Sequence, residues 1–92
     1  VALATHKRLF EKILSNIKEV KARGAKVIAI AEDGHTIIEE EADDVVYIPK
    51  ALDFVLPSLT VIPLQLFSYY VAVQKGCDVD KPRNLAKSVT VE

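Results

Sequence analysis

Few side chains in this chain of 92 residues have a type and spacing that could do chemistry. His6 and His35 could bind a metal, but neither has a cysteine or carboxylate at metal-ligand spacing, so we expect solvated surface residues. Cys77 is the one cysteine, which excludes an intrachain disulfide, and without a motif partner we expect a plain thiol. The acidic residues 39–44, EEEADD, more often face solvent than hold a cation. The sequence therefore predicts no metal site.

The sequence also gives little support for a site that binds phosphate or nucleic acid. The three glycines are isolated, so the chain has no glycine-rich phosphate cradle, although the hydroxyls of Ser88 and Thr90 could bind phosphate. We expect Tyr47, Tyr69 and Tyr70 to be core or interface rings rather than platforms for nucleobases. Twelve basic and thirteen acidic residues argue against a polyanion-binding protein.

The composition indicates part of a folded protein. Half of the residues are hydrophobic, which excludes intrinsic disorder. A chain this short buries only about 60% of its unfolded surface, so this apolar content indicates a missing partner surface. The chain begins with Val1 and contains no methionine, so we expect a processed chain or a fragment. The single cysteine is consistent with a reducing compartment.

Residues 7–23 predict an amphipathic helix. Thr5 could cap its start, and Glu19 and Arg23 have the i,i+4 spacing of a stabilising pair. Gly24 follows where a C-cap glycine is expected. Six apolar residues at helical spacing would form one face: Leu9, Phe10, Ile13, Leu14, Ile17 and Val20.

Two short apolar runs predict strands of a buried parallel sheet in an α/β fold. They are residues 26–31, KVIAIA, and residues 44–49, DVVYIP. Residues 32–34, EDG, predict a turn. Residues 35–41 predict a helical turn or an irregular loop. Because the two strands lie close in sequence, we expect a short connection between them rather than a full helix.

Residues 53–75 predict a long apolar helix. Pro57 and Pro63 each remove a backbone donor, so we expect this helix to be broken or kinked, with residues 64–75 as its best continuous stretch. Residues 54–74 carry no charge and are long enough to cross a bilayer. Their serines, threonine, glutamine and prolines favour a buried or interfacial helix instead. No signal-peptide pattern begins the chain.

Residues 75–92, KGCDVDKPRNLAKSVTVE, closely resemble the carboxyl-terminal end of the glucosamine-6-phosphate synthase family. These enzymes are also called glutamine–fructose-6-phosphate aminotransferases (isomerizing). The motif D-x-D-x-P-R-N-L-A-K-S-V-T-V-E is long and specific, and it matches to the last residue. Residues 14–17, LSNI, 21–24, KARG, and 61–73, VIPLQLFSYYVAV, resemble the same family, so the resemblance covers essentially the whole chain. Departures lie mainly in residues 32–56.

The resemblance implies a partial flavodoxin-like parallel sheet of a sugar isomerase (SIS) domain, with flanking helices and an extended carboxyl-terminal tail. Residues 1–76 would be the last part of the second SIS domain, and residues 77–92 the tail over the sugar-phosphate site. The family makes glucosamine 6-phosphate from fructose 6-phosphate and glutamine. Ammonia travels to the sugar from an amino-terminal glutaminase domain. The resemblance implies no cofactor, a homodimer of the whole enzyme and a cytoplasmic location.

By resemblance, Lys87 is the lysine at the sugar site, implicated in opening the ring and in a Schiff base with the C2 carbonyl. Ala86 would contact the sugar site through its backbone, and Leu85, Ala86 and Val89 would line or flank the ammonia channel. A Schiff-base amine must lose its proton, which a lysine does near neutral pH when it is desolvated or beside other cations. The apolar neighbours of Lys87 are consistent with a partly apolar pocket that would desolvate it. Without the resemblance, a lysine near the end of a chain would be expected to be a solvated charge.

Two other functions stay open beside this leading one. The chain could be a structural or interaction segment that holds the two halves of the enzyme and its dimer together, with Lys87 a mere tail charge. It could instead be an independent SIS-like module that binds sugar phosphates. The family's Ser/Thr-rich phosphate loop is absent from this chain, which counts against that module. The leading prediction is a carboxyl-terminal part that contributes the active-site tail and is not sufficient for catalysis by itself.

Overall fold

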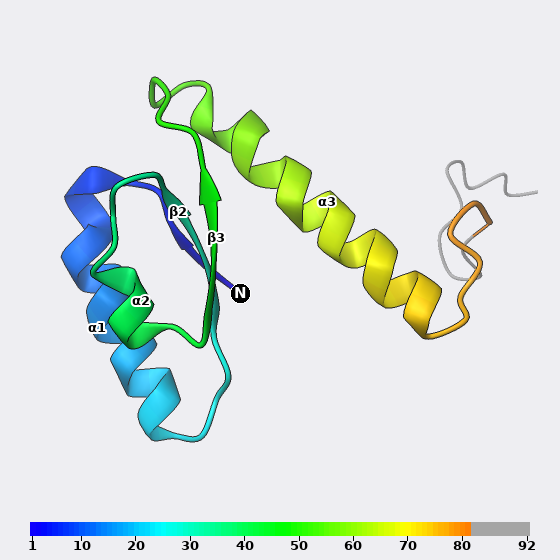
Figure 1. Ribbon diagram of the computed structural model, residues 1–92, viewed down its shortest axis with the longest axis horizontal. Helices are drawn as coiled ribbons and strands as arrows, with labels where there is room; N and C mark the ends of the chain where they lie inside the picture. The colour runs from blue at the N-terminus through cyan, green and yellow to red at the C-terminus, as the bar shows by residue number, and fades with distance from the viewer. Residues whose placement is uncertain (82–92) are drawn as a thin grey trace, which may run out of the picture. The chain divides into compact units, whose positions relative to one another are not determined.

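The computed structural model describes residues 1–81, whose elements appear in Figure 1. The strands are β1 (Ala2–Ala4), β2 (Ile28–Glu32) and β3 (Asp44–Ile48). The helices are the 3₁₀ turn η1 (Lys7–Leu9), α1 (Phe10–Ala22), α2 (Ile38–Glu41) and α3 (Leu56–Gln74). The chain divides into two compact units, Val1–Val61 and Ile62–Glu92, so their boundary falls inside α3.

The three strands form a parallel sheet in the order β1-β2-β3. Leu3, Ile30 and Val46 lie opposite one another across the sheet, and Glu32 lies opposite Ile48. The α/β fold and the two predicted strands are therefore confirmed. β1 was not predicted, because three residues are too few for an apolar pattern to identify a strand.

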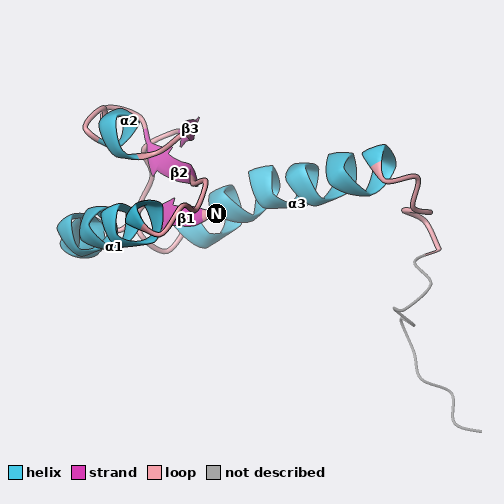
Figure 2. Ribbon diagram, turned by 90° about the horizontal axis from the view of Figure 1, so that it is seen from below, coloured by secondary structure: helices cyan, strands magenta, loops and turns pink. Residues whose placement is uncertain are grey.

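One face of the sheet carries α1 and α2. Both connections step across the sheet in the same direction, and because such crossovers are right-handed both helices must lie on the same face, as Figure 2 shows. The core there combines small strand residues with larger helix residues: Ala4, Ala29 and Ala31 against Ile17 and Ile38. Alanine on the strands lets the helices pack closely on the sheet. The short connection predicted between β2 and β3 is confirmed, since α2 has four residues.

The start of α1 differs from its prediction. The chain enters through η1, where the N–H of Leu9 bonds the carbonyl of His6 at 3.1 Å. His6 and Leu9 occupy the two N-cap positions, and neither makes a side-chain cap bond. The predicted cap by Thr5 is therefore wrong, because the 3₁₀ turn moves the helix start along the chain.

Both long helices end in the same way. Gly24 and Gly76 have φ of 85° and 71°, a left-handed conformation that glycine adopts without a side-chain clash. After α1, the N–H of Gly24 bonds Lys21 O at 2.9 Å and the N–H of Ala25 bonds Val20 O at 3.1 Å. The residues after α3 repeat this pattern, which is a Schellman motif. The predicted C-cap glycines are confirmed.

α3 is a single helix of 19 residues, so the predicted break is wrong. Pro57 is the second helical residue, where an N–H would have no intrahelical partner in any case. Pro63 lies inside the helix and leaves the carbonyl of Leu59 without its usual donor. By length and composition α3 could cross a membrane, and only 11% of its most apolar stretch is buried. The buried or interfacial environment expected for this helix stays a prediction.

Candidate functional site

The carboxyl ends of the three parallel strands meet at one edge of the sheet, where open α/β sheets bind their ligands. Residues 5–9 follow β1, residues 33–37 follow β2 and residues 49–51 follow β3. These loops bring Glu32, His35 and Lys50 to the same edge. The sequence alone did not single out Glu32 or Lys50.

Glu32 is the last residue of the central strand and is only 2% exposed. By the strand register it shares with Ile30 and Ile48 the face that is opposite α1 and α2. The structure records no ion pair of its carboxylate among residues 1–81. Burying a charged carboxylate is costly unless a donor or cation compensates it, so Glu32 is the most notable polar group of this edge. One feature of the sequence could have singled out Glu32: it is an acidic residue that ends an apolar run and is followed by Asp-Gly.

His35 lies against Phe10 in the first turn of α1. The two ring centroids are 4.8 Å apart and the rings are inclined by 55°. Its Nδ1 is buried and has no hydrogen-bond partner among the described residues. His35 is half-buried, so the solvated position predicted for it is only partly right, whereas the exposed position predicted for His6 is confirmed. The contact joins residues distant in the chain, so local patterns could not reveal it.

Lys50 lies over the turn that follows β2. Gly34 has a φ of 95°, and a Cβ placed on it would be 3.5 Å from both Cε and Nζ of Lys50. The N–H of Asp33 donates to the carbonyl of Ile48 at 2.9 Å, which ties this turn to the end of β3. The loops after β2 and β3 are thus held together, with one ammonium group at their surface.

Within the acidic run of residues 39–44, Asp43 lies at the opposite end of the sheet, just before β3. Asp43 Oδ2 accepts the N–H of Val27 at 2.7 Å, and Oδ1 lies 3.4 Å from Lys21 Nζ. The hydrogen bond from Val27 is the main cause that lowers the pKa of Asp43 below its ordinary 3.8. Among the residues that the structure describes, no three His, Cys, Asp or Glu side chains are grouped to hold a metal ion.

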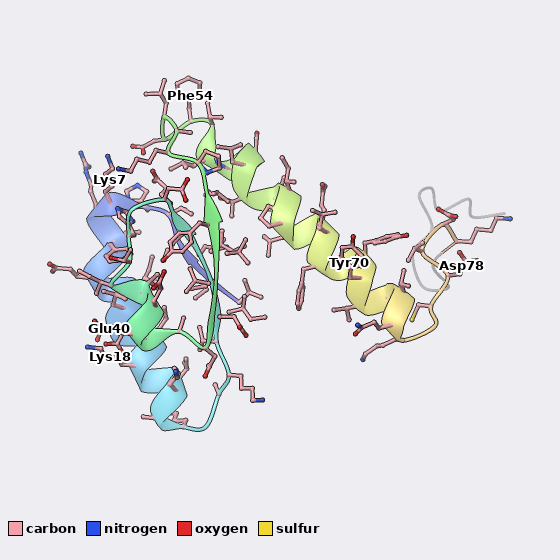
Figure 3. The ribbon with its side chains drawn as sticks, in the orientation of Figure 1. Lys7, Lys18, Glu40, Phe54, Tyr70 and Asp78 are labelled. Atoms are coloured by element: carbon pink, nitrogen blue, oxygen red, sulfur yellow. The ribbon has the colours of Figure 1, made fainter. Side chains whose placement is uncertain are left out.

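Two further acids of this run pair with neighbouring elements. Figure 3 shows Lys18 on α1, and its Nζ is 3.0 Å from Glu41 Oε1 on α2. The hydroxyl of Tyr47 donates to Glu39 Oε1 at 2.6 Å. This bond, followed by desolvation, raises the pKa of Tyr47 to about 12. These contacts fix α2 against α1 and β3, which gives the acidic residues a structural role.

The residues predicted for the sugar site lie outside the described part of the chain. They are Leu85, Ala86, Lys87 and Val89. The described chain leads toward them through a turn in which Asp78 Oδ1 accepts the N–H groups of Asp80 at 3.0 Å and Lys81 at 3.1 Å (Asp78 is labelled in Figure 3). Cys77, just before this turn, is exposed. Residues 1–81 by themselves bring together a carboxylate, a histidine and a lysine, but no nucleophile paired with a base.

The parallel sheet with helices on one face defines an α/β domain, and comparison with protein families identifies its class. A family model described as SIS domain matches residues 1–75. The chain therefore belongs to the SIS domain family, as the resemblance of its sequence predicted.

The matches to individual relatives point to a particular enzyme name. The chain is 65% identical to the glutamine–fructose-6-phosphate aminotransferase [isomerizing] of Caldanaerobacter subterraneus subsp. tengcongensis. It is 60% identical to the enzyme of the same name from Clostridium acetobutylicum, and 59% identical to that from Clostridium tetani. Each match covers all 92 residues of this chain but 15% of the relative. The matched part is the carboxyl-terminal region of those proteins.

Proposed function

We propose that this chain is the carboxyl-terminal part of a glutamine–fructose-6-phosphate aminotransferase (isomerizing). Residues 1–76 would complete an SIS domain, and residues 77–92 would form the tail over the sugar-phosphate site. The observation that supports this most is 65% identity over all 92 residues to a relative of that name. The matched range includes the tail motif, whose residue types the proposed chemistry needs.

In this proposal Lys87 supplies the reactive amine. Its uncharged amino group attacks the C2 carbonyl of open-chain fructose 6-phosphate, and loss of water leaves a Schiff base. Ala86 contacts the sugar through its backbone, and Leu85, Ala86 and Val89 line the path by which ammonia arrives. Ammonia then displaces the lysine at C2, which returns Lys87 as a free amine.

The rest of the enzyme would supply the ammonia and would hold the sugar phosphate. Glutamine would be hydrolysed by a separate glutaminase domain, and the sugar phosphate would be held by a loop that these 92 residues do not contain. The whole enzyme would be a cytoplasmic homodimer without a cofactor. The isolated chain would have no activity, because it lacks both the phosphate loop and the glutaminase.

The decisive experiment replaces Lys87 by arginine in the whole enzyme. Arginine keeps the charge but cannot be deprotonated to form a Schiff base. We expect formation of glucosamine 6-phosphate to fall about a hundredfold or more, while hydrolysis of glutamine stays within about twofold of the wild type. Coupled assays of the two products measure both rates.

Lys81→Arg is the matched control, since Lys81 is an exposed lysine of the same segment. It should leave both rates unchanged. Wild-type sugar amination by the Lys87→Arg enzyme would contradict the catalytic role. That outcome would favour the alternative in which the tail only holds parts of the enzyme together.

A further inference from the structure

The segment that follows α3, residues 75–81, is held by hydrogen bonds rather than by burial. Each of these residues is exposed. Gly76 has a φ of 71°, and the N–H of Cys77 donates to the carbonyl of Ala72 at 2.9 Å, which ends the helix. Ordering a backbone costs conformational entropy, and no burial offsets that cost in the described chain. The direction of the backbone after α3 therefore depends on local hydrogen bonds.

Asp78 supplies these bonds. Its Oδ1 accepts the N–H groups of Asp80 at 3.0 Å and of Lys81 at 3.1 Å (Asp78 is labelled in Figure 3). This is an Asx turn, in which a side-chain oxygen takes the place of a backbone carbonyl. Within residues 75–81, no other side chain makes a recorded hydrogen bond or ion pair with residues 1–81. One carboxylate thus sets the path of the chain as it leaves α3.

The sequence adds a second constraint at the same point. Lys81 precedes Pro82, and a proline restricts the backbone of the residue before it to extended conformations. The Asp78 turn and this restriction together leave few directions for the chain at Lys81. Lys87 follows six residues later, a stretch that spans at most about 20 Å. The direction taken at Lys81 therefore decides which part of the enzyme the amine of Lys87 can reach.

We propose that Asp78 is a positioning residue for sugar amination, whose turn directs the tail so that Lys87 reaches the C2 carbonyl. This inference rests on the proposed function, because it takes Lys87 as the reacting amine. Asp78 itself touches neither the sugar nor the ammonia. Without the turn the reacting groups are intact, but the tail samples more conformations. A smaller fraction of enzyme molecules then holds Lys87 at the carbonyl, which slows the reaction.

Variants of the whole enzyme at Asp78 separate the geometry of the turn from its charge. Asp78→Asn keeps an oxygen at the position of Oδ1, so the turn persists without the charge. Asp78→Glu keeps the charge on a side chain too long for the turn, and Asp78→Ala removes both. We expect the kcat of sugar amination to stay within about twofold of the wild type in Asp78→Asn, and to fall about tenfold in the other two. The KM for fructose 6-phosphate should stay within about twofold in all three, because other residues hold the phosphate.

Asp80→Ala is the matched control. Asp80 contributes its backbone N–H to the turn, which alanine retains, so this variant should keep the wild-type kcat. Glutamine hydrolysis without sugar and the Tm are measured for every variant, because general destabilisation lowers both, whereas loss of positioning lowers amination alone. Wild-type kcat in Asp78→Glu would overturn the inference. A loss in Asp78→Asn or Asp80→Ala as large as that in Asp78→Ala would also overturn it, and so would an equal loss of glutamine hydrolysis.

The Lys87→Arg enzyme, assayed beside these variants, separates this inference from the proposed function. If Lys87→Arg abolishes amination and Asp78→Glu does not lower it, only the role of Asp78 is refuted. If Lys87→Arg aminates the sugar at the wild-type rate, the catalytic role of Lys87 fails, and the positioning role of Asp78 fails with it.

Discussion

Asp43 shows how one side chain can connect three segments. Its carboxylate accepts the N–H of Val27, and its own N–H donates to the carbonyl of Val27 at 2.9 Å. The same carboxylate lies near Lys21 at the end of α1. The start of β3 is thereby tied to the residue before β2 and to the helix. Because the charged form makes these contacts, the pKa of Asp43 is lowered, and its stabilising effect depends on pH.

We predict that Asp43→Asn destabilises the protein only where the carboxylate is charged. A lowered pKa in the folded state means that the contribution is complete above the ordinary value of 3.8, and is lost as the pH falls through the folded pKa. At pH 7 the variant should have a lower Tm than the wild type, and the difference should shrink below pH 4 or so. Circular dichroism melts across this range measure it.

Asp53→Asn serves as the control, since Asp53 is an exposed acid for which the structure records no ion pair among residues 1–81. Its Tm should follow the wild type at every pH. A constant difference between Asp43→Asn and the wild type down to pH 2 or so would show that the charge of Asp43 is not the cause.

At the scale of elements, helix ends were easier to predict than helix interiors and starts. Gly24 and Gly76 end their helices in a left-handed conformation that other residues rarely adopt. Proline is a weaker signal, because Pro57 lies in the first turn of α3, where it removes no helical bond. Pro63 costs one bond of a helix that continues on both sides. The cap predicted at Thr5 failed because the 3₁₀ turn η1 moves the helix start along the chain.

We predict that Gly24→Ala lowers the free energy of unfolding by about 1 kcal/mol. A Cβ at Gly24 would meet nothing within 4 Å, so the cost comes from the backbone, whose φ is 85°. Gly24→Asn should cost less, because asparagine tolerates the left-handed region better than alanine does. Urea denaturation of the wild type and the two variants measures the order of their free energies of unfolding. Equal stability of the alanine variant and the wild type would contradict it.

At the scale of the whole molecule, α3 stands out because so few of its side chains are covered within the chain. Leu66, Phe67 and Tyr70 are 52%, 47% and 61% exposed (Tyr70 is labelled in Figure 3). Contiguous apolar surface of this kind marks contact with another surface. In the proposed enzyme, the rest of the polypeptide is available to cover this surface.

We predict that the isolated chain of 92 residues self-associates through α3. The double variant Phe67→Glu/Tyr70→Glu should shift the chain toward monomer, because each substitution places a charge on the apolar surface. Sedimentation velocity over a range of concentrations measures the change. Ile37→Glu is the control, since it places the same charge at an exposed position outside α3. If the wild type, the double variant and the control associate equally, self-association occurs through another surface.

Local and family-level features of this protein could be predicted from its sequence. The i,i+4 pair of Glu19 and Arg23 is present at 2.9 Å. The strands predicted at residues 26–31 and 44–49 are present as β2 (Ile28–Glu32) and β3 (Asp44–Ile48) of a parallel sheet. The tail motif, which ends the chain, pointed to the family that the relatives bear out. Each of these depends on residue types within a short stretch of chain, where spacing and conformational preference suffice.

Tertiary structure decided the rest. Four features depend on segments that are distant in the sequence. They are the pairing of β1, the burial of Glu32, the contact of His35 with Phe10 and the hydrogen bond from Val27 to Asp43. The last of these spans 16 residues. Such contacts form only when the sheet aligns its strands and right-handed connections place the helices on one face, so no local pattern encodes them.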